Sequence, residues 1–230
     1  MLEHLRTQVL EANLEIVRRG LALYTFGNAS GIDRESGLVA IKPSGVAYET
    51  MKPSDLVITD LNGTIVEGDL SPSSDLATHL YLYREFSAIG GVVHTHSEYA
   101  TAWAQAGLPI PVYGTTHADY FYGPVPVTEP LSDQEIAGDY VLNTGAAIVR
   151  RFKDLDPAAT PGVLVHGHAP FTWGKTPADA AHLAVVLESI ARMAYFTATL
   201  NTNCREVSQA LLDRHYYRKH GEKATYGQKT

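Results

Sequence analysis

The segment from Gly90 to Ser97 reads Gly-Gly-Val-Val-His-Thr-His-Ser. A glycine pair followed by two valines is typical of a buried strand, and side chains two positions apart on a strand project from the same face. His94 and His96 should therefore present their imidazole rings side by side. A second His-x-His pair, His166 and His168, follows another β-branched run. A third imidazole is thus available to complete three nitrogen ligands around a metal ion with one open position.

Three loops before residue 76 have the composition of anion-binding turns: residues 27–31, 42–45 and 71–75. They are rich in glycine, serine and asparagine, which tolerate unusual backbone angles and expose N–H groups. The third loop should also begin a helix, whose N-terminus has unpaired N–H groups and the positive end of a dipole. Each loop alone is also consistent with an ordinary turn or cap. Together they favour a convergent phosphate pocket.

The remaining pattern predicts an α/β fold with an antiparallel sheet. Asn62 and Gly63, between two β-rich runs, give the strongest hairpin signal in the chain. Apolar periodicity and capping residues predict helices over residues 5–19, 76–86, 99–105, 132–142, 176–200 and 208–220, and strands over residues 38–41, 55–61, 64–66, 146–152 and 163–166. The segment 114–123 fits neither period, and loops of its titratable and aromatic composition are often functional.

Composition narrows the classes of partner. The 230 residues are enough for one sizeable core, and no stretch has the composition of a linker, so we expect one domain over residues 1–230. A net charge of −7 argues against nucleic acid as a partner, although a few local donors can still hold one phosphate. The first residues lack a signal-peptide pattern, and no apolar run approaches the length needed to cross a bilayer, so no membrane partner is expected. The lone cysteine, Cys204, excludes an intrachain disulfide. We therefore expect a cytoplasmic protein.

Several of these motifs occur together in a known family. Gly27-Asn28, the turn Lys42-Pro43-Ser44-Gly45, Ser73-Ser74-Asp75, His94-Thr95-His96 and His166-Gly167-His168, in this order, resemble the class II aldolase and adducin family. The resemblance covers essentially the whole chain, including residues 114–123 and 211–221. It implies a three-layer α/β/α sandwich with a mostly antiparallel central sheet. It also implies a homotetramer with one zinc ion per subunit near a subunit boundary, which manganese or cobalt could replace.

The resemblance also assigns roles to individual positions. It implies that the metal ligands are His94, His96 and His166, with Asp75 beside or on the metal, and that His168 is only a neighbour. It implies contacts to a phosphorylated substrate from Gly27, Asn28, Ser44, Gly45, Ser73 and Ser74. It implies that Asp119 and Tyr226 form the acid/base pair.

Three activities remain open within this family. One is an epimerase that cleaves and re-forms a carbon–carbon bond of a phosphorylated ketopentose, and another is a sugar-phosphate aldolase that releases both fragments. The aldolases carry a glutamate where this chain has Asp75, which favours the epimerase. The third is a non-enzymatic module, since adducin heads share the fold without the metal, and the ligand histidines disfavour it. No Gly-x-Gly-x-x-Gly motif follows a strand, which disfavours a nicotinamide-dependent route.

Overall fold

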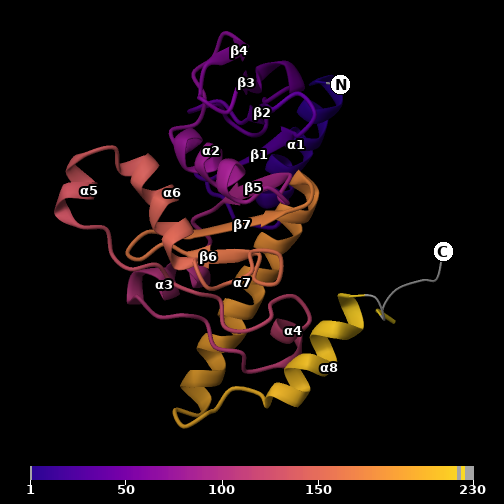
Figure 1. The fold of residues 1–230 in the computed structure, drawn as a ribbon, viewed down its shortest axis with the longest axis vertical. Helices are drawn as coiled ribbons and strands as arrows, with labels where there is room; N and C mark the ends of the chain where they lie inside the picture. The colour runs from indigo at the N-terminus through magenta and orange to yellow at the C-terminus, as the bar shows by residue number, and fades with distance from the viewer. Residues whose placement is uncertain (1, 222–223, 226–230) are drawn as a thin grey trace.

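The protein is described by a computed structural model that covers residues 2–221 and 224–225. Its centre is a seven-stranded sheet with the order β4-β3-β2-β1-β5-β7-β6 (Figure 1). The strands are β1 (Asn28–Asp33), β2 (Leu38–Ile41), β3 (Val57–Thr59), β4 (Ile65–Glu67), β5 (Gly91–His94), β6 (Gly162–Leu164) and β7 (Pro170–Gly174). Every neighbouring pair of strands runs antiparallel, which confirms the predicted sheet.

Helices cover both faces of the sheet, as the three-layer prediction required. α1 (Leu2–Arg18) and α7 (Pro177–Leu200) pack on one face, and α2 (Leu76–Glu85) and α6 (Tyr140–Arg151) on the other. Adjacent residues of β5 show this division, because Val93 joins the core under α1 and α7 whereas Val92 joins the core under α2 and α6. Because successive side chains of a strand point to opposite faces of the sheet, one strand contributes residues to the cores on both faces.

The other helices lie outside these two layers. They are the 3-10 helix η1 (Pro53–Asp55) and the helices α3 (Glu98–Ala106), α4 (Thr115–Ala118), α5 (Asp133–Ala137) and α8 (Gln209–Lys219). In Figure 1, α4 and α8 lie side by side at one end of the molecule, and the two elements contact each other. The predicted segment 114–123 thus contains a short helix that packs against the C-terminal helix.

The sequence prediction is wrong around residue 146. A strand is expected over residues 146–152, but residues 146–151 form the second half of α6 and Phe152 is its C-cap. Asp139 caps this helix by accepting a hydrogen bond from the backbone N–H of Leu142, and Gly138 separates it from α5, so the expected single helix over 132–142 is divided. Gly145 allows α6 to approach α2, since a Cβ there would lie 2.7 Å from the Cβ of Tyr81.

α7 is long and apolar enough to cross a membrane by length and composition, contrary to the expectation that no apolar run approaches that length. In the fold it packs against β5, β7 and α1, and five of its alanines, Ala180, Ala181, Ala184, Ala191 and Ala194, belong to the core clusters, whereas Met193, Phe196 and Leu200 near its C-terminal end are exposed. Core helices pass the same test of length and composition, and the packing of the N-terminal half of α7 on the sheet is that of a core helix.

Candidate metal and substrate site

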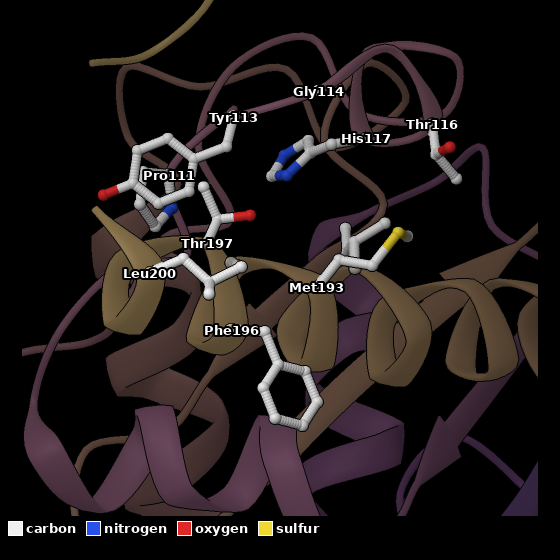
Figure 2. Close-up of a pocket in the computed structure, with 11 residues that line it drawn as sticks. Pro111, Tyr113, Gly114, Thr116, His117, Met193, Phe196, Thr197 and Leu200 are labelled. Carbon is white, nitrogen blue, oxygen red and sulfur yellow. The ribbon is translucent and has the colours of Figure 1, made fainter. Parts of the chain in front are cut away.

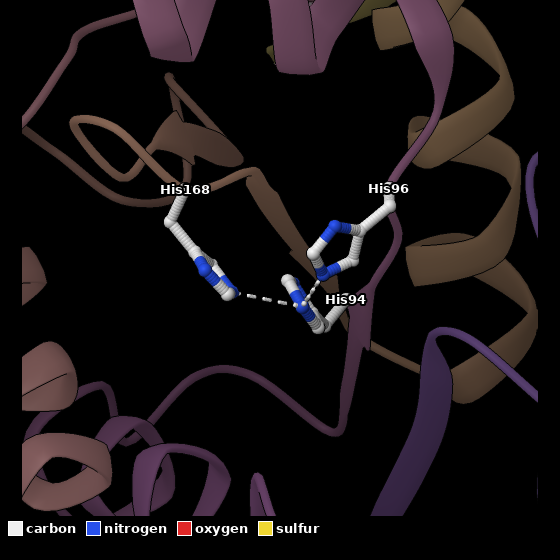
Figure 3. Close-up of side chains that lie close together, drawn as sticks. All are labelled: His94, His96 and His168. Atoms are coloured by element: carbon white, nitrogen blue, oxygen red, sulfur yellow. Dashed lines mark hydrogen bonds between the residues drawn. The ribbon is translucent and has the colours of Figure 1, made fainter.

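Three imidazole rings converge where β5 ends (Figure 3). His94 is the last residue of β5, His96 follows it by two positions, and His168 lies in the turn between β6 and β7. The Nε2 atom of His94 lies 3.1 Å from that of His96 and 3.2 Å from that of His168. Among the described residues, these three form the one group of ligand-type side chains whose donor atoms lie close enough to share an ion.

Neighbouring groups fix the orientation of two of these rings. His94 Nδ1 donates to the carbonyl oxygen of Pro170 at 3.0 Å, so the Nε2 atom of the neutral ring carries a lone pair. His168 Nδ1 lies 3.4 Å from the hydroxyl of Tyr140. The His94 ring is also stacked between His168 and Phe171, at centroid distances of 5.0 and 4.2 Å. The Nε2 atoms therefore point inward while Nδ1 atoms engage the surrounding protein.

The three Nε2 atoms of His94, His96 and His168, here called the histidine group, are placed as ligands of a zinc-like ion would be. The single lone pair of His94 Nε2 can accept one hydrogen bond, from the Nε2 of His96 or from the Nε2 of His168 but not from both. A cation at the centre would engage all three lone pairs. Nitrogen ligands at about 2.0–2.1 Å from a tetrahedral ion are separated by roughly 3.3 Å, close to the two observed distances.

Burial keeps these ligands neutral. It lowers the pKa of His94 to about 3, and it also lowers the pKa of His96 and of His168. Proximity of the rings to one another adds to the effect at His94 and His168. Unprotonated imidazoles are the form that binds a metal ion, so no proton has to leave these rings when the ion binds at neutral pH.

The structure brings a different histidine to this group from the one expected as the third ligand. His168 completes the group, whereas His166 is exposed and lies against Gly107, where an added Cβ would come within 2.6 Å of its Nε2. The reason is that β6 ends at Leu164, so the second His-x-His pair lies in a turn and not on a strand. Gly167, at φ +69°, reverses the chain between the two histidines and sends their rings in different directions.

Asp75 lies beside the histidine group and is not a member of it. The amide nitrogen of Asn28 donates to its Oδ2 at 2.6 Å and to Ser73 Oγ at 3.0 Å. Burial alone would raise the pKa of Asp75, but the nearby rings of His94 and His79 and the Asn28 hydrogen bond outweigh it and hold that pKa below its ordinary value. The carboxylate is therefore an oriented negative charge at the edge of the histidine group.

The anion-type loops and the histidines line one cavity of about 440 Å³. Its walls include all the residues expected to contact substrate, namely Gly27, Asn28, Ser44, Gly45, Ser73 and Ser74, together with Asp75, His94, His96 and His168. Asn28 Oδ1 is buried and has no hydrogen-bond partner among the described residues, so an acceptor is available there. Gly27 has φ +75°, and a Cβ would lie 2.8 Å from the carbonyl oxygen of His94, which explains a glycine at this close approach.

The cavity also contains a residue that the sequence analysis did not select. Lys42 lines it but is only 2% exposed, and its Nζ donates to the carbonyl oxygen of Pro43 at 3.3 Å. Burial lowers the pKa of Lys42. The sequence alone could have indicated Lys42 as an anion-binding residue, because it is the only cationic side chain in the three anion-type loops.

Asp119, one of the two expected acid/base residues, does not line this cavity. Asp119 is buried against α8, where Arg218 donates to both carboxylate oxygens at 3.0 and 2.7 Å and His215 Nδ1 lies at 3.0 Å. Burial raises the pKa of Asp119, but the hydrogen bonds from Arg218 and His215 outweigh it, and the pKa is lowered overall. Tyr226 lies outside the described residues.

Comparison with known proteins agrees with this architecture. The family model described as Class II Aldolase and Adducin N-terminal domain matches residues 7–195. An L-fuculose 1-phosphate aldolase structure has a TM-score of 0.78 and 25% sequence identity, over 92% of this chain and 94% of that chain. L-fuculose 1-phosphate aldolase from Glaciozyma antarctica has a TM-score of 0.77 and 17% identity, over 97% and 84% of the two chains.

A third structure, l-fuculose-1-phosphate aldolase from Thermus Thermophilus, has a TM-score of 0.69 and 24% identity, over 88% of this chain and 99% of that chain. The family match spans most of the 230 residues, and it includes both His94 and His168. The chain belongs to the class II aldolase and adducin family.

Proposed function

We propose that this protein is a zinc-dependent L-ribulose-5-phosphate 4-epimerase, which interconverts L-ribulose 5-phosphate and D-xylulose 5-phosphate in the cytoplasm during L-arabinose catabolism. The coarser assignment, a class II aldolase-type enzyme of sugar phosphates, is supported by the family match and by the L-fuculose 1-phosphate aldolase structure. The finer assignment is supported by the cavity, because the histidine group and the three anion-type loops line it together.

His94, His96 and His168 would hold the metal ion, because their Nε2 atoms converge and their rings are neutral. Zinc suits three imidazoles, and manganese or cobalt could substitute. When bound, the ion supplies a Lewis acid that stabilises negative charge on a substrate oxygen. His166 takes no part, since it faces Gly107.

The substrate phosphate would bind at the loops that line the cavity. Ser44, Ser73 and Ser74 offer hydroxyl groups, and the backbone N–H groups of these loops and the Lys42 ammonium add donors and charge. Binding energy from this remote group positions the reacting carbons, so it contributes to turnover as well as to affinity.

The observation that carries the epimerase assignment is the placement of Asp75. The Asn28 amide holds its carboxylate at 2.6 Å, beside the histidine group. An aspartate fixed there suits a position next to the metal, whereas the family's aldolases use a longer glutamate at this place as a base on the substrate.

Inversion at C4 constrains the chemistry. The C4 proton is not alpha to the C2 carbonyl, so its removal would leave a carbanion that cannot delocalise. Cleavage of the C3–C4 bond avoids this: the C4 hydroxyl gives its proton to a base, C4 becomes the aldehyde of glycolaldehyde phosphate, and the bonding electrons remain on the other fragment as an enediolate. Rotation of the aldehyde and re-formation of the bond, with return of the proton, gives the other epimer.

We assign the proton transfers at the C4 oxygen to Asp119 and Tyr226, each serving one face of the aldehyde. Asp119 lies against α8 and does not line the cavity of its own subunit, so a neighbouring subunit would have to supply it. The chain has an exposed apolar surface suited to such an assembly. Met193, Phe196 and Leu200 of α7 border a cleft of about 310 Å³, and residues of segment 111–117 line its opposite side (Figure 2). We propose a homotetramer with active sites near its interfaces.

A sugar-phosphate aldolase, such as a fuculose- or rhamnulose-phosphate aldolase, is the second candidate. The observation that favours it is the similarity to the L-fuculose 1-phosphate aldolase structure over nearly the full length of both chains. Both candidates share cleavage of a carbon–carbon bond, and they differ in whether the fragments leave the site.

The experiment that separates the two candidates compares substrates. Purified zinc-loaded protein is incubated with L-ribulose 5-phosphate, L-fuculose 1-phosphate or L-rhamnulose 1-phosphate, and products are identified by NMR. We expect D-xylulose 5-phosphate from the first substrate and no release of dihydroxyacetone phosphate from the other two. Dihydroxyacetone phosphate release, with no epimerisation of L-ribulose 5-phosphate, would establish the aldolase instead.

A further inference from the structure

Close to the anion-type loops of the cavity lies Tyr48, which the proposed reaction does not use. Its side chain is 1% exposed and belongs to the core under α1. Its hydroxyl donates toward the carbonyl oxygens of Phe26 and Gly27, at 3.0 and 2.8 Å. Burial raises the pKa of Tyr48, so the hydroxyl stays protonated at neutral pH. The hydroxyl therefore ties the loop that leads into Asn28 to the protein core.

The ring of Tyr48 has a different neighbour. The Lys42 ammonium lies 4.7 Å from the ring centroid, within the range of a cation–π contact. Among the described residues no carboxylate forms an ion pair with Lys42, although its side chain is buried. A buried ammonium without an anionic partner is costly, and the face of an aromatic ring compensates part of that cost without neutralising the charge. The charge thus stays available to an anion in the cavity.

We propose that Tyr48 is a positioning residue for anion binding, whose ring holds the Lys42 ammonium at the cavity and whose hydroxyl holds the Phe26–Gly27 backbone. The two contacts are separable, because phenylalanine keeps the ring and leucine removes both. Only the turnover arm of the test rests on the proposed epimerase activity, since inorganic phosphate binding is measured without a sugar.

The test compares Tyr48→Phe, Tyr48→Leu, Lys42→Met and the double variant Tyr48→Leu/Lys42→Met. Tyr83→Phe is the matched control, because Tyr83 is equally buried but its hydroxyl bonds to Ser30. Isothermal titration gives the dissociation constant of inorganic phosphate, and zinc content and melting temperature report folding. Turnover is measured with L-ribulose 5-phosphate.

We expect Tyr48→Phe to keep phosphate affinity within about threefold of wild type while turnover falls by about tenfold or more, because only the loop is released. Tyr48→Leu should weaken phosphate binding on the order of tenfold, the size of a desolvated cation–π contact. In the Lys42→Met background the leucine substitution should weaken phosphate binding no further, since the ring acts through the ammonium. Tyr83→Phe should leave phosphate binding unchanged.

Unchanged phosphate affinity in a folded Tyr48→Leu, or full additivity with Lys42→Met, would overturn the inference. If leucine prevents folding, Tyr48→Met serves as the non-aromatic replacement, and if neither folds, the split between affinity and turnover in Tyr48→Phe decides. A wild-type protein that binds no phosphate would refute both this inference and the sugar-phosphate function. Normal wild-type binding with an unaffected Tyr48→Leu would refute the inference alone.

Discussion

Replacing His168 by alanine should abolish tight metal binding, whereas replacing His166 should not. The two histidines are separated by one glycine, yet only His168 presents its Nε2 to His94, at 3.2 Å. Structural zinc sites with four ligands bind with about 10–16 kcal/mol, or roughly 2.5–4 kcal/mol per ligand. Loss of one imidazole should therefore raise the zinc dissociation constant by about 10²–10³-fold, since about 1.4 kcal/mol corresponds to a factor of ten.

The measurement is a zinc competition titration against a chromogenic chelator at about pH 7.5, where the ligand imidazoles are neutral, with zinc content of the purified proteins as a second readout. His166→Ala is the matched control and should stay within about threefold of wild type, because its exposed ring contacts Gly107 and not the histidine group. Melting temperatures of the metal-free proteins should be similar. Loss of zinc from His166→Ala together with retention by His168→Ala would refute the assigned ligand set.

Three further outcomes follow from particular residues. Lowering the pH from about 7.5 to about 5.5 should reduce the free energy of unfolding of the metal-free protein by about 1 kcal/mol each for His79 and His117. Burial lowers the pKa of both histidines to about 4, so on acidification the unfolded chain binds protons before the folded protein does. Urea titrations at several pH values should show that His117→Asn reduces the dependence of the free energy of unfolding on pH. A free energy of unfolding that rises as the pH falls would contradict the effect expected for these two buried histidines. Deleting residues 226–230 should preserve zinc content and melting temperature but cut turnover by about 10²-fold or more, as expected for loss of Tyr226, and a fully active truncated enzyme would contradict this role. Gly91→Ala should lower the free energy of unfolding by about 1–3 kcal/mol in urea titrations, since its Cβ would lie 2.5 Å from the backbone of Pro177, and unchanged stability would contradict that packing.

The sequence predicted correctly those elements that depend on interactions between residues close in the chain. The β5 strand, the hairpin at Asn62 and the long helix capped by Thr176 each depend on neighbouring residues, and each is present. The strand expected over 146–152 failed because its apolar residues suit either period, and the decisive feature, the approach of Gly145 to Tyr81, joins distant parts of the chain.

In the site too, local features could be predicted from the sequence and long-range ones could not. The strand pattern correctly predicted that His94 and His96 lie together, although β5 ends at His94 and His96 lies just beyond it. The choice between His166 and His168 depended on a turn that begins one residue earlier than the β-branched run suggests. The position of Asp119 could not be predicted, because its partner Arg218 lies 99 residues further along the chain. Long-range pairing of this kind leaves no periodic trace in the sequence.

Carbon–carbon cleavage is tested most directly by following L-ribulose 5-phosphate with the zinc-loaded enzyme in D₂O by NMR. The C4 hydrogen stays on the aldehyde carbon throughout cleavage and re-formation of the C3–C4 bond. Cleavage therefore predicts D-xylulose 5-phosphate that retains protium at C4. Deuterium at C4, or no D-xylulose 5-phosphate at all, would contradict it.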